Sequence, residues 1–230
     1  MTEEPVMDFG IEMAQARQRL YAVSALAQQQ FEQALQAYIE QNPVLARQAL
    51  SQLPKVHDFE IEMDDHCLDM LSHTASNSDL RLVLALLKAI RDIEQISNQA
   101  NQIAQQVLLA TTGQPALSQL TAIATLAEPV AKMLTLALAA LQQQSIGKAE
   151  QAQQLAPLVN RYYGSILRCN LLNSADQSAL LESTVSVNWV ARALERIAEH
   201  SVNLAKQAIF LAKVSSGQSL RVELQPRRPR

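Results

Sequence analysis

Apolar residues recur at steps of three and four along most of this chain, and this spacing restricts its fold more than any other feature. In the first such segment the repeating positions are Leu20, Val23, Leu26, Phe31, Leu35 and Ile39. Residues at these steps lie on one face of an α-helix, and that face must be buried against a neighbour. The chain has only five glycines, which would interrupt helices, and only 4% aromatic residues, which would favour strands. We therefore predict an all-α protein.

Polar clusters and Gly-Pro breaks divide the pattern into six predicted helices. The breaks are Asn42-Pro43, residues 74–79, Thr112-Gly113-Gln114-Pro115, Ser145-Ile146-Gly147 and Asn173-Ser174-Ala175-Asp176. Residues of these types cap helices or cannot continue them. The predicted helices cover about residues 9–41, 43–72, 80–111, 115–144, 148–170 and 177–214.

The two halves of the chain resemble each other. Ile93-Glu94-Gln95-Ile96-Ser97 in the third helix is similar to Leu194-Glu195-Arg196-Ile197-Ala198 in the sixth. The clearest break lies between these halves, so a three-helix unit is duplicated. We predict two tandem antiparallel three-helix bundles, over residues 1–112 and 113–214, followed by a polar and basic tail over residues 215–230. A single six-helix array is the alternative packing.

Charge and hydropathy exclude several classes of protein. The net charge of −3 and isoelectric point of about 5.8 are unlike those of nucleic-acid-binding proteins. The acidic start of the chain does not resemble a signal peptide. The richest apolar run, residues 133–141, is shorter than the ~18–20 residues that a membrane span requires. Two isolated cysteines predict neither a disulfide framework nor a zinc site. We expect a cytoplasmic protein with no membrane insertion.

Acidic residues are concentrated on the second predicted helix. Glu60 and Asp64 are four residues apart, so their carboxylates share a helix face and repel each other. A bound cation would remove that repulsion, because carboxylate oxygens suit hard metal ions. A solvated acidic face with no ligand is the alternative interpretation.

The third and sixth predicted helices repeat this arrangement. Glu94 and Asn98 are four residues apart, as are Glu195 and Glu199. An arginine precedes the first glutamate of each pair by three residues, so plain salt bridges are an equally good interpretation. The four histidines form no recognisable metal motif and are expected at surface or boundary positions. Because no nucleophile motif or phosphate-binding glycine loop is present, we expect that the protein is not an enzyme.

Several of these segments resemble the PhoU family of phosphate-uptake regulators. Ser78-Asp79-Leu80-Arg81 followed by Ile93-Glu94-Gln95-Ile96 is similar to the third helix of a PhoU repeat. Residues 194–200 resemble the same core in a second repeat, and residues 59–67 resemble the acidic segment of the second helix. The resemblance covers residues 10–214.

The resemblance implies a fold of two three-helix bundles, each able to hold a metal cluster on acidic motifs from two helices. It also implies a cytoplasmic negative regulator of phosphate uptake and of phosphate-starvation signalling. Such proteins act as adaptors for the phosphate ABC transporter and the phosphate-sensing histidine kinase. The metal ligands carried over are Glu60, Asp64, Glu94 and Asn98 in the first bundle and Glu195 and Glu199 in the second. The ion would be iron, magnesium, calcium or zinc.

Departures from the family pattern weaken this prediction. Asn98 and Asn101 replace acids, and amide oxygens bring no charge to a cation. In the fifth predicted helix, residues 159–164 contain no acid where acids are expected, and Arg161 would repel a metal. We therefore predict a weak metal site in the first bundle and little or none in the second. A helical scaffold or dimerisation protein that has lost the phosphate role is the alternative function. Long amphipathic helices also favour a homodimer.

Overall fold

The structure, a computed structural model, describes residues 8–73, 76–109, 114–173 and 178–215. These residues form eight α-helices. Their bounds are α1 Phe9–Glu40, α2 Pro43–Leu50, α3 Leu53–Ser72, α4 Asn77–Leu109, α5 Leu117–Gln143, α6 Ile146–Gln154, α7 Ala156–Asn173 and α8 Ser178–Ser215.

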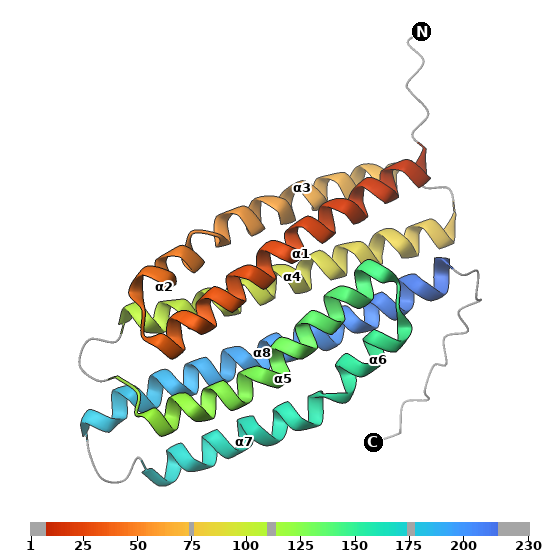
Figure 1. Cartoon of the computed structure of the whole chain (residues 1–230). Coiled ribbons are helices and arrows are strands. Elements are labelled where there is room, and N and C mark those ends of the chain that lie inside the picture. The colour runs from red at the N-terminus through yellow and green to blue at the C-terminus, as the bar shows by residue number, and fades with distance from the viewer. Residues whose placement is uncertain (1–7, 74–75, 110–113, 174–177, 216–230) are drawn as a thin grey trace, which may run out of the picture.

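The helices form two similar bundles that lie side by side (Figure 1). One contains α1, α4 and the α2–α3 pair, and the other contains α5, α8 and the α6–α7 pair. The bundles meet mainly where α4 packs against α8, and also where α1 packs against α5. Along their contact α4 and α8 run in opposite directions (Figure 1). The predicted all-α fold of two antiparallel three-helix bundles is confirmed.

The predicted domain bounds, residues 1–112 and 113–214 with a tail over 215–230, stay a prediction. The boundary between residues 112 and 113 lies outside the described part of the chain, as do residues 216–230 of the predicted tail. Extensive packing between α4 and α8 means that the two bundles share an apolar interior.

The second helix of each bundle is broken, which corrects the prediction of continuous helices over residues 43–72 and 148–170. The breaks separate α2 from α3 and α6 from α7. Pro54 lies in the first turn of α3, and Pro157 lies in the first turn of α7. Proline cannot donate a backbone hydrogen bond, and its ring clashes with the preceding turn, so it favours the first turn of a helix.

The two halves also use the same connection after their first helix. Among the described residues, Gln41 and Gln144 are the non-glycine residues with positive φ, and they end α1 and α5. The next residue caps the following helix: the Asn42 side chain accepts a hydrogen bond from the backbone N–H of Val44 (3.0 Å), and the Ser145 side chain accepts one from the backbone N–H of Lys148 (3.4 Å). Helix α6 therefore starts at Ile146, earlier than the predicted position 148. This shared connection between the first and second helices supports the duplication of one three-helix unit.

Helix α5 is the one described helix that is long and apolar enough to span a membrane by length and composition alone. In the structure it packs against α8, α6, α7 and α1 as a core helix of the second bundle. Its buried residues include Ile123, Leu126, Val130 and Met133. The core helices of globular proteins commonly have such a composition.

Candidate metal centre

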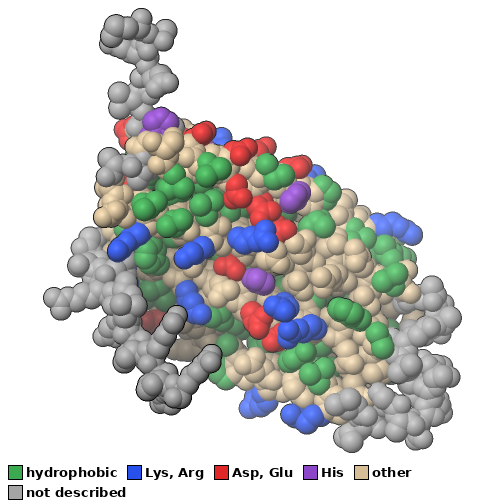
Figure 2. All heavy atoms as spheres, turned by 180° about the vertical axis from the view of Figure 1, so that it is seen from behind, with side chains coloured by type: hydrophobic (Ala, Val, Ile, Leu, Met, Phe, Trp, Pro, Cys, Tyr) green, Lys and Arg blue, Asp and Glu red, His purple; other side chains and the backbone are tan. Residues whose placement is uncertain are grey.

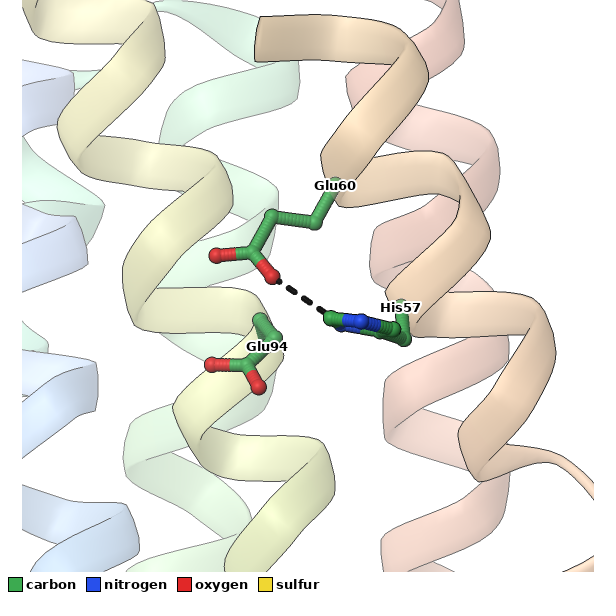
Figure 3. Close-up of side chains that lie close together, drawn as sticks. All are labelled: His57, Glu60 and Glu94. Carbon is green, nitrogen blue, oxygen red and sulfur yellow. Dashed lines mark ion pairs between the residues drawn. The ribbon is translucent and has the colours of Figure 1, made fainter.

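Three potential metal ligands converge between α3 and α4 in the first bundle (Figure 3). The ligand atoms of His57, Glu60 and Glu94 all lie within 4.8 Å of one another. His57 Nδ1 lies 3.3 Å from a carboxylate oxygen of Glu60. Both glutamates are buried at 7% exposure, whereas the histidine is exposed. The cluster therefore opens to solvent on its histidine side.

Apolar packing on either side fixes the two helices that carry these ligands. Val56 and Met63 of α3 are buried and flank the position of Glu60. On α4, Ile90 and Ile93 are buried immediately before Glu94. Helical spacing then places each glutamate at the edge of its apolar stripe, facing the other helix.

Arg91 is the counter-ion of the two glutamates. Its Nη1 donates a hydrogen bond to Oε1 of Glu60 at 2.9 Å and lies 3.9 Å from Oε2 of Glu94. The hydrogen bond to Glu60 raises the pKa of Arg91. The arginine side chain is nevertheless 66% exposed, so it can turn towards solvent with little loss of packing. The single charge of the guanidinium group balances one of the two carboxylate charges that a metal ion would bind.

The remaining predicted ligands of the first bundle lie beside the cluster. The Asn98 side chain donates a hydrogen bond to Oε1 of Glu94, and Gln95 donates to Oε2 at 2.7 Å. Asp64 lies one turn beyond Glu60 on α3 and is exposed. Its pKa is raised by partial desolvation and by the negative charge of Glu60. Asp64 therefore adds to the negative potential but is not one of the three converging ligands.

The chemistry of the three ligands fits a transition metal. One imidazole and two carboxylates are the donors that iron, zinc and manganese accept in proteins. Their closeness allows a single ion to contact all three. Such an ion must compete with Arg91 for the same oxygens, which favours weak binding.

The second bundle lacks this convergence among its described residues. Glu195 pairs with Arg192 at 2.6 Å, and Glu199 pairs with Arg196 at 3.5 Å. Burial and the neighbouring Glu199 raise the pKa of Glu195. Against the effect of burial, Glu195 and then Tyr163 of α7 raise the pKa of Arg192. A tyrosine is thus the neighbour of this arginine on α7, whereas Glu60 on α3 is the partner of Arg91 in the first bundle.

A hollow of about 500 Å³ lies over these glutamates. Asn160 of α7 lines it, along with cationic side chains that include Arg196 and Lys206. Arg161, which was expected to repel a metal ion here, lies instead with its guanidinium 5.5 Å from the ring centre of Tyr162. The mixed charges around this hollow do not suit a cation.

Salt bridges from Arg91 to Glu94 and from Arg192 to Glu195, the alternative interpretation of these acidic pairs, are present in the structure. Two other features of the site were not predicted from sequence. The stronger contact of Arg91 is with Glu60 on another helix, which no local spacing could reveal. His57 is exposed, as predicted, but its position three residues before Glu60 also places both side chains on one helix face. That spacing was the signal that could have included it.

Comparison with known proteins gives a consistent result. The family model described as the PhoU domain matches twice, over residues 20–107 and 123–208. A "Phosphate-specific transport system accessory protein PhoU homolog" of Pseudomonas aeruginosa is 25% identical, with 93% of this chain and 88% of that protein covered. The PhoU accessory proteins of Edwardsiella tarda and Escherichia coli are 27% and 25% identical over 93% of this chain, with 86% and 87% of those proteins covered.

Solved structures agree with this assignment. The crystal structure of PhoU from Pseudomonas aeruginosa superposes with a TM-score of 0.85 at 25% identity, covering 90% of this chain and 99% of that one. The phosphate transport system regulatory protein PhoU from Streptococcus pneumoniae matches in fold, with a TM-score of 0.79 at 19% identity and coverage of 91% and 98%.

Proposed function

The chain belongs to the PhoU family, and we propose that it is a cytoplasmic negative regulator of phosphate uptake and of phosphate-starvation signalling. It would act by binding proteins, namely the phosphate ABC transporter and its sensor histidine kinase. The names of the relatives, which describe accessory proteins of the phosphate-specific transport system, support this proposal.

The observation that carries the proposal is that both repeats are retained over nearly their full length. The family model matches each bundle separately, and the match in the first bundle includes the cluster of His57, Glu60 and Glu94. An adaptor requires a rigid surface rather than reactive groups. We therefore propose a regulatory role without catalysis, consistent with relatives named as accessory proteins.

We further propose that the first bundle binds one metal ion weakly and that the second binds none. Glu60, Glu94 and His57 would hold the ion, with Asp64 and Asn98 beside them. The ion would neutralise two buried carboxylates and tie α3 to α4 in place of Arg91. The metal content of variants in each bundle tests this proposal.

One observation favours a different function. Among the residues that line the hollow over Glu195 and Glu199, α7 contributes Asn160 and no carboxylate, so the second bundle has no counterpart of Glu60. A scaffold or dimerisation protein that no longer acts in phosphate signalling would show such loss. Fold-level similarity alone does not distinguish the two functions.

Deletion of the gene, followed by a phosphatase reporter in cells grown at high phosphate, separates these functions. A negative regulator predicts that deletion raises reporter activity and that the intact gene restores repression. Unchanged reporter activity in high phosphate contradicts the regulatory proposal and favours the scaffold. A strain carrying Lys132→Gln, a change at an exposed position on α5, is a matched control and should repress normally.

We also propose a homodimer. Several large apolar side chains are exposed, including Trp189 at 56% and Leu109 at 66%. Sedimentation equilibrium of the full chain tests this directly. A monomer at micromolar concentration contradicts it.

A further inference from the structure

A basic and apolar groove lies between α4 and α8, near the start of α4 and the end of α8. Its hollow has a volume of about 480 Å³. The residues that line it are Arg81, Leu84, Ala85, Lys88, Lys206, Gln207 and Phe210. Figure 2 shows the face that carries α4 and α8, where lysine and arginine side chains gather beside a hydrophobic patch. We call this feature the α4–α8 groove.

Helical spacing gives the groove a regular wall. On α4, Arg81, Leu84 and Lys88 lie at steps of three and four, so they share one face over two turns, or about 10 Å. On α8, Lys206 and Phe210 are four residues apart and share the opposing face. An apolar floor is therefore bordered by cations on both sides.

The three cations of the groove have no acidic partner among the described residues. No carboxylate lines the hollow, and the arginine ion pairs found in the described chain, which include those of Arg91, Arg192 and Arg196, do not involve these three cations. All three side chains are exposed. Three neighbouring positive charges in a protein of net charge −3 create a local attraction for an anionic partner.

The basic border of the groove is not a consequence of the repeated fold. When Glu94 is aligned with Glu195, the counterpart of Lys88 is Trp189 and the counterpart of Lys206 is Gln105. The counterpart of Leu84 is Val185, so the apolar position is kept while both lysines are lost. The basic border is therefore particular to one end of the α4–α8 contact.

The apolar floor determines which anion fits. Free phosphate would use the cations but not Phe210 or Leu84, which is 42% exposed. A flat lipid surface cannot enter a concave hollow. A helix with one apolar edge and acidic residues on either side uses both features, as in other helix-in-groove interactions.

We propose that the α4–α8 groove binds an acidic amphipathic helix of a partner protein. An apolar side chain of that helix would lie on Leu84 and Phe210, while its carboxylates would pair with Arg81, Lys88 and Lys206. This inference rests on the proposed adaptor function, because it names the surface that a partner would contact. The partner's acidic residues would supply specificity and speed of association.

Fluorescence anisotropy with the purified full-length protein tests the groove. The probe is a synthetic peptide of about 20 residues, long enough to form a helix, with leucine along one edge and glutamate on both sides. We expect saturable binding that weakens with salt. The double variant Lys88→Glu, Lys206→Glu should weaken it by on the order of ten-fold or more. Leu84→Ser should also weaken binding, whereas a matched peptide with glutamine in place of glutamate should not bind.

The control variant Lys55→Glu, Lys132→Glu makes the same change in net charge at exposed positions on α3 and α5 and should bind like the unmodified protein. Equal weakening in this control would reduce the effect to net charge and overturn the proposal. Displacement of the peptide by millimolar phosphate alone, or equally strong groove-dependent binding to phosphatidylglycerol vesicles, would also overturn it. Because the assay uses purified components, its failure would leave the result of the phosphatase reporter unaffected.

Discussion

Replacing Arg91 with glutamine should destabilise the protein in a way that a divalent cation reverses. In the folded chain the ligand atoms of Glu60 and Glu94 lie within 4.8 Å, and Arg91 is the cation that contacts both. Glutamine keeps much of the length of the side chain but removes the charge. The two buried carboxylates would then repel each other without compensation.

The size of the effect follows from Coulomb's law. Two unit charges at that separation repel by about 3.5 kcal/mol at an effective dielectric constant of 20, and by about 0.9 kcal/mol in water. Because Arg91 is 66% exposed, solvent already screens much of its contribution. We therefore expect a loss of about 1–2 kcal/mol, which corresponds to a decrease in Tm of roughly 2–8 °C for a chain of this size.

Thermal unfolding followed by circular dichroism, with chelator and then with Mn²⁺, measures both parts of this prediction. In chelator the Arg91→Gln variant should melt below the unmodified protein. Added Mn²⁺ should raise its Tm more than it raises that of the unmodified protein, because the competing guanidinium has been removed. Arg196→Gln is the control, since its ion pair with Glu199 is exposed. A Tm for Arg91→Gln equal to that of the unmodified protein, or one that does not respond to Mn²⁺, would refute this reasoning.

Three other changes have expected outcomes. Burial raises the pKa of Tyr38 to about 12, against about 10 in the unfolded chain. The free energy of unfolding, which is at its full value below pH 10, should therefore fall by about 2–3 kcal/mol as the pH rises to 12. In urea titrations at alkaline pH, Tyr38→Phe should remove that loss. Burial, together with the charge of Asp64, raises the pKa of the Cys67 thiol to about 11, so a thiol reagent at pH 7.5 should label exposed Cys169 quickly and Cys67 only on unfolding. Mass spectrometry of the labelled peptides checks this, and rapid labelling of Cys67 in the folded protein would contradict it. The Ser97 hydroxyl donates a hydrogen bond to the side chain of Gln30, and both residues are fully buried. Ser97→Ala should therefore lower the free energy of unfolding, measured in urea, by about 1–3 kcal/mol. A decrease below about 0.5 kcal/mol, the effect of a surface change, would show that the pair is not needed.

Most of the fold could be predicted from the sequence because local rules determine it. Long apolar stripes with few glycines favour helices that pack together, and Asn42 followed directly by Pro43 is a typical start of a helix. Pro54 and Pro157 each lie in the first turn of a new helix, a position that proline favours, whereas Pro129 lies inside the continuous α5. The equivalent positions of Pro54 and Pro157 in the two halves were a further sign of duplication in the sequence.

The candidate site could be predicted less well from the sequence, because it depends on contacts between helices that are distant in the chain. Sequence spacing relates Glu60 to Asp64, but the structure joins Glu60 to Arg91 across 31 positions. The contact between His200 of α8 and Asp92 of α4, at 2.8 Å, likewise requires knowledge of how the bundles pack. Helical spacing shows which residues share a face, whereas only the tertiary arrangement shows which faces meet.

Metal analysis of protein purified without chelator tests most directly whether the first bundle, and not the second, is built to hold a cation. Mass spectrometry would compare the unmodified chain with Glu60→Gln and with the double variant Glu195→Gln, Glu199→Gln. We predict that metal bound to the unmodified chain remains in the double variant and is lost from Glu60→Gln. Equal loss from both variants, or metal retained by Glu60→Gln, would contradict the account.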